Sequence, residues 1–249
     1  MSQRRWESAA RFWYSNGTLT LAEISPAALA TAEVYRLMTD LVAPRPIAWV
    51  SSEDGQGRRN LAPFSYYQAV CSQPPMIVIS IAWHPDGRMK DTLANILERR
   101  EFVVSHVSEP WLAAMNATSA ALAPGESEWE FADVPAEPAS VVGPSRVSGA
   151  LAHLECRLTQ AIPLGTGLGG NTPGKPSATL VLAEVVHFAV AADLLQRDAR
   201  GRLTAIDPGR LAAVGRLGGI AYTRTTDRVS LARPEPAASP APLSTTRRD

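Results

Sequence analysis

The chain has 249 residues, enough for one large domain or two small ones. Its 24 Lys and Arg balance 24 Asp and Glu, so no net charge favours nucleic acid or an anionic membrane as a partner. No stretch approaches 18 uncharged apolar residues and the start lacks the apolar core of a signal peptide, so we expect no membrane association.

Two cysteines are present, Cys71 and Cys156, and each lies in an apolar run typical of a strand. Such isolated cysteines do not indicate a disulfide framework. We predict that both are small buried side chains in a protein of the reducing cytoplasm.

The ends of the chain differ from its middle. Residues 1–30 mix aromatic and charged side chains, which favours a helical or irregular surface arm that could cover a partner subunit. Residues 234–249 are rich in proline and lack large apolar side chains, which predicts a flexible tail. A single domain is expected between them, over residues 31–233.

Within this domain, most of the apolar pattern alternates with period two, which is typical of strands. Strands are predicted at Ile47–Ser51, 60–70, Met76–Ile81, Phe102–Ser105, Leu151–Leu158 and Leu180–Val190. Helices are predicted at Thr92–Arg100, Pro110–Ala121 and Pro208–Val214. Many strands with few helices favour an antiparallel barrel or sandwich over βαβ repeats.

The start of the first predicted helix could bind an anion. Asp91 or Thr92 is expected as its N-cap, and the backbone N–H groups of a helix N-terminus attract negative charge. Arg88 and Lys90 lie just before it. This arrangement predicts a phosphate site. The alternative is an ordinary capped helix preceded by solvated basic side chains.

Three further segments have a composition that suits a flat ligand. Arg45 lies between two prolines before the first strand, and could either face a ligand or form a salt bridge at the rim of a barrel. Small residues at strand ends let backbone groups approach a ring. These are Ser51 and Ser52, followed by Asn60, Leu61, Ala62 and Ser65. By themselves they would be typical turn residues.

The third segment begins at Arg216 and ends at Tyr222, with Gly218 and Gly219 between them. Two glycines permit close backbone approach, and the arginine and tyrosine can hydrogen-bond to or stack on a ring. A helix C-cap is the alternative explanation of the glycines.

Other chemistries are disfavoured. Gly165–Gly170 fits the GxGxxG pattern, but prolines follow it, so no helix can begin there to receive a pyrophosphate. We predict a mobile loop at 165–176 that could act as a lid over the substrate side. The four histidines are far apart in sequence and form no metal motif. No hydrolase signature is present either, so the chemistry must come from a cofactor. His187 and Tyr222 are weak catalytic candidates, and His84 could reach a bound phosphate.

Taken in order, the segments PRPIAWVSS (44–52), NLAPFS (60–65), GRMKDTLANILERREFVV (87–104), RLGG (216–219) and Tyr222 resemble the flavin-reductase-like family of FMN-binding split β-barrels. The resemblance spans roughly residues 33–234. It implies a mainly β, Greek-key-like antiparallel barrel with a few flanking helices, and a homodimer with FMN at the interface. The residues implied to bind FMN are Arg45, Ser51, Ser52, Asn60, Leu61, Ala62, Ser65, Ser80, Arg88, Lys90, Asp91, Thr92, Arg216 and Tyr222.

The resemblance also implies an activity. Flavin reductases of this kind pass hydride from NADH or NADPH to flavin, and O2 or a flavin-dependent monooxygenase uses the reduced product. The segments PRPIAWVS and NLAPFS are closer to the longer, flavoprotein-oxygenase-like branch, and the glycine-histidine motif that helps short reductases to hold NADH is absent. Two alternatives stay open: a bound-FMN enzyme that acts directly on a small organic molecule, and a non-catalytic FMN storage or delivery protein.

Overall fold

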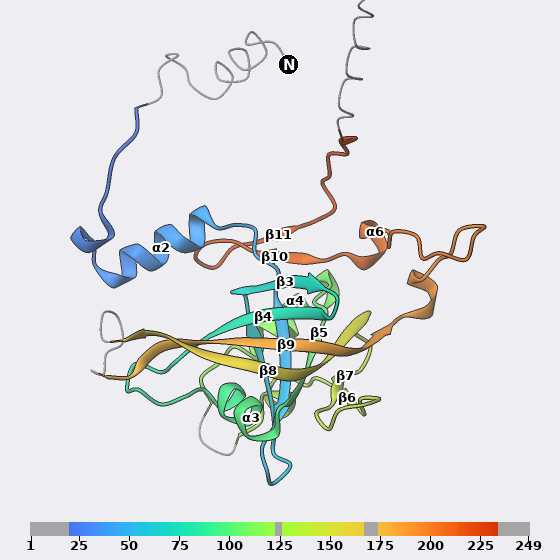
Figure 1. The fold of residues 1–249 in the computed structure, drawn as a ribbon, viewed down its shortest axis with the longest axis horizontal. Helices are drawn as coiled ribbons and strands as arrows, with labels where there is room; N and C mark the ends of the chain where they lie inside the picture. Colours follow the sequence, from blue (N-terminus) through green and yellow to red (C-terminus); the bar gives the residue numbers. More distant parts are fainter. Residues whose placement is uncertain (1–19, 123–125, 167–173, 234–249) are drawn as a thin grey trace, which may run out of the picture.

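A computed structural model describes residues 20–122, 126–166 and 174–233 (Figure 1). The strands are β1 (Ala48–Glu53), β2 (Arg59–Phe64), β3 (Tyr67–Ser72), β4 (Pro75–Ala82), β5 (Glu101–Ser105), β6 (Ala136–Glu137), β7 (Arg146–Val147), β8 (Ala152–Thr166), β9 (Pro176–Val190), β10 (Val214–Arg216) and β11 (Tyr222–Arg224). The α-helices are α2 (Thr31–Leu41), α3 (Asp91–Arg99), α4 (Leu112–Ala117), α5 (Glu128–Phe131) and α6 (Pro208–Leu211). Short 3-10 turns are Pro26–Ala28, Glu109–Trp111 and Ala192–Leu194. The mainly β prediction is confirmed.

Seven strands form one antiparallel sheet in the order β2-β1-β5-β8-β9-β4-β3. β8 and β9 form its central hairpin. In Figure 1, β8, β9, β4 and β3 run across the view, and β1 runs steeply behind them. This change of strand direction shows that the sheet is strongly curved.

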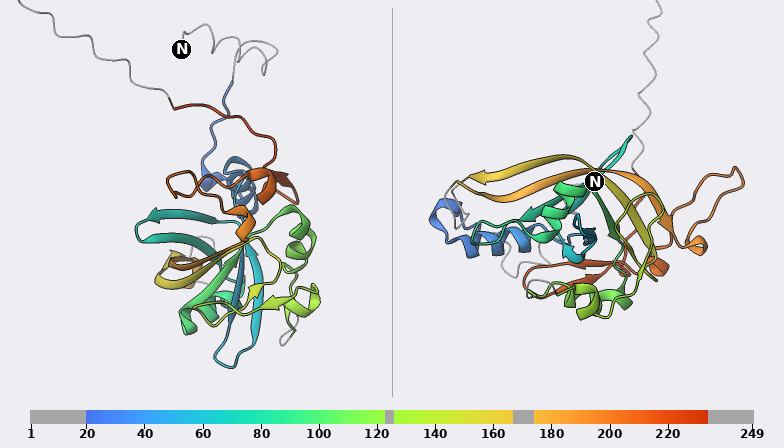
Figure 2. Two further views of the ribbon diagram at one scale, coloured as in Figure 1. Left: turned by 90° about the vertical axis from the view of Figure 1, so that its right-hand side faces the viewer. Right: turned by 90° about the horizontal axis from the view of Figure 1, so that it is seen from below.

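The chain itself brings the two edges of this sheet together. Residues 60–70, predicted as one strand, are split by Ser65 and Tyr66 into β2 and β3, which lie at opposite edges. The Ser80 amide of β4 donates to the Tyr66 carbonyl at 2.8 Å. Because two residues cannot bridge a flat seven-stranded sheet, the sheet must roll into a barrel with a seam at Ser65. Figure 2 shows this curvature from two further directions.

β1 is buried on both faces, because a hydrophobic cluster lies on each side of it. Ala48 and Val50 pack inside the barrel with residues of α3, β4, β5 and β9. Ile47 and Trp49 point to the other side, where they pack with Met115 of α4 and residues near α5. The double burial explains why this strand is apolar at consecutive positions.

α2 and the β10–β11 hairpin lie together over one end of the barrel (Figure 1). The amides of Arg45 and Arg216 donate to each other's carbonyls at 3.0 and 2.8 Å, so the first and last strand regions are paired. Gly218 and Gly219 form the hairpin turn, with Gly219 at a φ of 58°. The helix C-cap alternative for these glycines is therefore wrong.

Several boundaries differ from the predictions. The predicted helix Pro110–Ala121 is the turn Glu109–Trp111 followed by the shorter α4, and the helix predicted to reach Val214 ends at Leu211. Cys156 is buried, but Cys71 is exposed because β3 is an edge strand. Residues 1–19 of the predicted arm, 167–173 of the predicted lid and the tail 234–249 lie outside the described residues.

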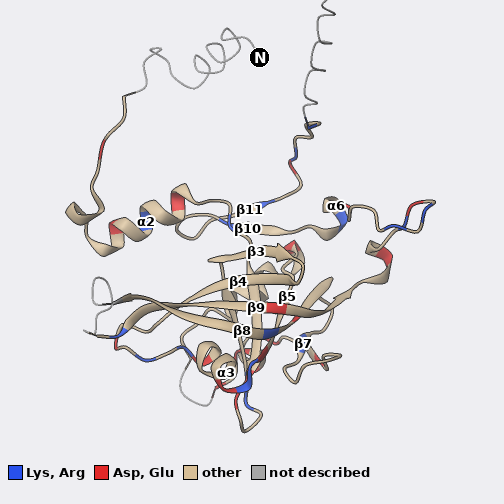
Figure 3. Cartoon of the chain, viewed as in Figure 1, with Lys and Arg blue, Asp and Glu red and all other residues tan. Residues whose placement is uncertain are grey.

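Charged side chains of both signs are interspersed along the described chain (Figure 3). Among the residues that the structure describes, no helix is long and apolar enough to cross a membrane.

Candidate functional site

Two adjoining cavities lie beside β2, and together we call them the cleft. The main cavity has a volume of about 510 Å3 and the side cavity about 180 Å3. Pro63, Phe64 and Ser119 line both cavities, so the two cavities adjoin at these residues. The main cavity contains the predicted residues Asn60, Ala62, Arg88, Lys90, Asp91 and Thr92, and the side cavity contains Ser65, Arg216 and Tyr222.

The N-terminus of α3 forms one wall of the main cavity. Its N-cap is Lys90, not Asp91 or Thr92 as predicted, and no side chain caps the first turn. The Lys90 carbonyl accepts the first hydrogen bonds of the helix, from the amides of Leu93 and Ala94. The amides of Asp91 and Thr92 precede these bonds and have no acceptor within the helix. A nine-residue helix with an uncapped start can receive an anion.

Thr92 is held rigidly at this wall. Its hydroxyl oxygen accepts a hydrogen bond from Nδ2 of Asn60 at 2.8 Å, and both side chains are buried. Since the threonine accepts from Asn60, its own O–H is oriented to donate elsewhere. β2 and α3 thereby fix a hydroxyl donor next to the uncapped amides.

Three basic side chains line the same cavity. Arg88 is exposed and forms an ion pair with Asp86 at 2.7 Å, and this hydrogen bond lowers the pKa of Asp86. The Lys90 ammonium lies 5.8 Å from the centre of the Phe64 ring. His84 completes the group from the same loop. All three can approach a ligand phosphate by a change of rotamer.

Two carboxylates that were not predicted from the sequence, those of Glu126 and Glu128, also line the main cavity. Glu128 of α5 accepts from the Leu61 amide at 3.2 Å, and its partial burial raises its pKa. Asp91 and Glu126 line the cavity nearby. The pattern Ser127-x-x-Glu130 is typical of a helix start and could have indicated α5.

The side cavity is built around Tyr222. Its hydroxyl donates to Oδ1 of Asn116 at 2.9 Å, and the Arg216 guanidinium lies 4.5 Å from the centre of its ring. Arg216 also donates to the Gly219 carbonyl. The hairpin and α4 therefore fix an aromatic face, a cation and an amide at the barrel seam.

Arg45 supports the cleft from behind. Its side chain is only 6% exposed, and it donates to the carbonyls of Thr39, Val42 and Leu217. A longer contact of 3.4 Å joins its Nε to Oγ of Ser65. Its bonds thus join α2, the hairpin and the seam instead of forming a salt bridge at the rim.

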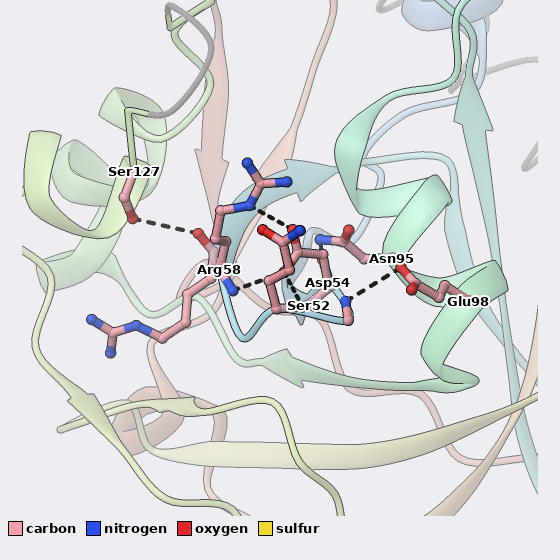
Figure 4. A network of polar contacts seen from close by, with 9 residues as sticks. Ser52, Asp54, Arg58, Asn95, Glu98 and Ser127 are labelled. Atoms are coloured by element: carbon pink, nitrogen blue, oxygen red, sulfur yellow. Dashed lines mark hydrogen bonds and ion pairs between the residues drawn. The ribbon is translucent and has the colours of Figure 1, made fainter.

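Other predicted residues lie outside both cavities. Ser51 donates to the Ser145 carbonyl, and Ser52 accepts from Nδ2 of Asn95 at 3.2 Å (Figure 4). Leu61 is fully buried in the core next to Trp49. Ser80 pairs with Leu180 between β4 and β9, and His187 lies on β9 opposite Glu155.

No group of three or more His, Cys, Asp or Glu side chains that could hold a metal ion occurs among the described residues.

Comparisons with known proteins agree on one family. The model of the family described as "Flavin reductase like domain" matches residues 41–207. A protein of Halalkalibacterium halodurans is 39% identical over 212 residues, which cover 85% of this chain and 96% of that relative.

Two solved structures are similar in both sequence and fold. Nitrilotriacetate monooxygenase component B from Bacillus cereus has a TM-score of 0.77 and 34% identity, over 86% of this chain and 100% of that chain. The 2-nitrobenzoate 2-nitroreductase NbaA of Pseudomonas fluorescens has a TM-score of 0.72 and 30% identity, over 88% and 100%.

Proposed function

Since the chain belongs to the flavin reductase-like domain family, we propose that it binds FMN in the cleft and works as a flavin-dependent oxidoreductase. The observation that carries this proposal is the uncapped start of α3, which opens beside Thr92 into a cavity of about 510 Å3. That volume lies within the usual range of cofactor sites, about 300–1,000 Å3.

The phosphate is assigned to the α3 end of the main cavity. The first amides of α3 and the Thr92 hydroxyl supply donors of fixed direction, and Lys90 and Arg88 supply positive charge. The carboxylates of Asp91, Glu126 and Glu128 line the same cavity, so the anion is expected on the basic side of the space.

The ring is assigned to the seam, along β2 and into the side cavity. Ala62, Pro63 and Phe64 form an apolar wall, and Tyr222 and Arg216 offer groups that stack or hydrogen-bond. Backbone and hydroxyl groups near Ser65 can pair with the polar edge of an isoalloxazine. Arg45 is a positioning residue, because it holds Ser65 and the hairpin together.

Bound flavin would supply hydride transfer, a reaction that needs no protein base. The part of this chain is to orient the ring, hold the phosphate and limit access of water and O2. We propose NADH or NADPH as hydride donor, and O2 or a monooxygenase as the user of the reduced flavin. The similarity to a monooxygenase component B supports such a partner. A homodimer and a cytoplasmic location complete the proposal.

A second candidate function is direct reduction or oxygenation of a small organic molecule by FMN that stays bound. The similarity to a 2-nitrobenzoate 2-nitroreductase favours it, because that protein is named for an organic substrate.

The deciding experiment is an absorption spectrum of the purified full chain between about 300 and 550 nm, followed by anaerobic addition of NADH or NADPH with and without free FMN. Bleaching of the flavin band supports the reductase. A bound flavin that neither nucleotide bleaches favours the second candidate or a storage protein. Absence of any flavin binding overturns the proposal.

The phosphate assignment has its own test. Lys90→Ala combined with Thr92→Val removes one charge and one hydroxyl donor with little change of volume at position 92. We expect the FMN dissociation constant to rise at least tenfold, measured by fluorescence quenching. Arg200→Ala, which removes an exposed positive charge that lines neither cavity, is the charge-matched control. Equal FMN affinity of the double variant and the control would show that the phosphate lies elsewhere.

A further inference from the structure

A second site lies at the end of the barrel, and no part of the proposed flavin chemistry uses it. This barrel-end cavity has a volume of about 180 Å3. Its walls are mainly apolar and include Ile47, Val104, Leu154 and Val214. They come from the start of β1, the end of β5, the start of β8, and β10.

These walls are held by backbone hydrogen bonds. Val104 pairs with Leu154 across β5 and β8, and the His106 amide donates to the Ala152 carbonyl at 2.8 Å. On the other side, the Val214 amide donates to the Val107 carbonyl at 3.3 Å, which fixes β10 over the cavity. The cavity is therefore formed without any ligand, because strands and not a loose loop enclose it.

The polar side chains that line the cavity differ in whether they have hydrogen-bond partners. Ser105 lies 3.0 Å from Nδ1 of His153 and accepts from the Val147 amide, so its hydroxyl is engaged. Burial raises the pKa of Tyr67 to about 12, so its hydroxyl stays neutral. Nε2 of His106, by contrast, is buried and has no hydrogen-bond partner among the described residues.

The state of His106 defines what it can bind. Burial lowers its pKa, although a hydrogen bond with the Leu211 backbone opposes this shift. A neutral imidazole has one donor nitrogen and one acceptor nitrogen. With its proton on Nδ1, a neutral His106 presents Nε2 as a buried acceptor without a donor.

We propose that the barrel-end cavity binds a small, mainly apolar molecule with one hydrogen-bond donor, such as a phenol, whose donor group binds to Nε2 of His106. The size fits: an apolar cavity of about 150 Å3 accommodates benzene. The apolar walls hold the body of the ligand, and the single acceptor fixes its orientation.

Ile47 gives this site a structural link to the cleft. It lines both the barrel-end cavity and the side cavity, and β10 continues from Val214 at one to Arg216 at the other. A molecule in the barrel-end cavity would therefore contact Val214 of β10, two residues before Arg216 on the same strand. The assignment itself does not depend on flavin binding, since no cleft side chain except Ile47 contributes to it.

The test uses the purified full chain with and without added FMN, and two fluorinated probes of similar shape. 4-Fluorophenol has a hydroxyl donor and 4-fluorotoluene does not. We expect 19F NMR titrations to give 4-fluorophenol an affinity about fivefold higher, as one hydrogen bond predicts. The 15N resonance of Nε2 of His106 is expected to shift with 4-fluorophenol, whether or not FMN is present.

Variants make the test specific. His106→Leu removes the acceptor, so 4-fluorophenol is expected to bind no more tightly than 4-fluorotoluene. His187→Leu is the matched control, and the affinities of both probes are expected to stay unchanged. Ala152→Leu fills the cavity and is expected to abolish binding of both probes. Melting temperatures show which variants are folded, and the Nε2 resonance of the wild type decides the result if a variant is not.

The proposal is overturned if neither probe binds, if both bind wild type equally, or if the Nε2 resonance of His106 stays unmoved at saturation.

Discussion

Glu155 is a fully buried carboxylate near the start of β8. It accepts from the amides of Ser140 and Val141 at 2.8 and 2.7 Å, and Arg146 lies 3.6 Å away. A buried charge is stable only when such partners surround it. Glu155 therefore attaches the segment before β7 to the barrel.

The variant Glu155→Gln keeps the shape but removes the charge and turns one acceptor into a donor that faces an amide. We expect the free energy of unfolding to fall by about 2–3 kcal/mol, measured by guanidinium denaturation. Glu184→Gln, an exposed position on the adjacent strand, is the control and is expected to change it by less than about 0.5 kcal/mol. A similar effect of both variants would contradict the role given to Glu155.

His153 predicts a dependence of stability on pH. Burial, assisted by the charge of Arg146, lowers its pKa to about 4, although Glu137 and Glu155 act in the opposite direction. The folded protein thus favours the neutral imidazole. This contribution is complete above the unfolded pKa of about 6.5 and is lost as the pH falls toward 4.

Between pH 7 and 4.5 we expect the free energy of unfolding to decrease by about 1 kcal/mol more in wild type than in His153→Gln. Guanidinium denaturation at each pH measures both. Parallel curves for the two proteins would show that His153 does not titrate as described.

At the scale of elements, the packing of α2 on the β10–β11 hairpin depends on Gly218. A Cβ atom at this position would lie 1.5 Å from Oδ1 of Asp40 and 2.8 Å from its Cγ. The two glycines were expected to let the backbone approach a ligand or to form a helix C-cap, but at Gly218 the close neighbour is a side chain of the protein itself.

We expect Gly218→Ala to lower the free energy of unfolding by about 1–3 kcal/mol, because Asp40 must move. Asp40→Ala in the same chain removes the clashing atoms and should restore most of the loss. Thermal unfolding of the two single variants and the double variant measures the coupling. Additive effects would mean that the two residues are not in contact.

The elements that sequence analysis found are those with a strong local pattern. α3 was predicted within one residue at each end, and the apolar runs of β1, β4 and β5 were located correctly. α2 was missed, although Val34, Leu37, Met38 and Leu41 follow the i, i+3, i+4, i+7 spacing of an amphipathic helix. The break between β2 and β3 has no local signal, since closure of the barrel imposes it.

The site was predictable to a similar extent. The basic residues and Thr92 beside α3 follow from a local motif, and the structure brings them into one cavity. The positions of Ser51, Ser52 and Leu61 could not be deduced, because which face of a strand meets a cavity depends on the neighbouring layers. Asn116 and Glu128 come from elements joined to the site only by tertiary packing.

At the scale of the molecule, α2 leaves large apolar side chains in contact with solvent. Tyr35 is 64% exposed, Met38 50% and Leu41 79%. A monomer rarely exposes such a group on one helix unless another surface covers it. This exposure supports the proposed homodimer.

We expect light scattering to find a dimer for the wild type and a monomer for Met38→Lys combined with Leu41→Lys. Arg36→Gln, an exposed change on the same helix, should leave the dimer intact. A monomeric wild type, or a dimeric double variant, would exclude α2 from the interface.

The backbone pairing of Arg45 with Arg216 has a consequence for biosynthesis. A ribosome releases β1, β2 and α3 long before β10, because the chain emerges from its N-terminus. The α3 side of the cleft can therefore assemble on the nascent chain, whereas the side that holds Tyr222 must wait for nearly the whole domain. A translation product that stops before residue 214 would have half a cleft and an open barrel end.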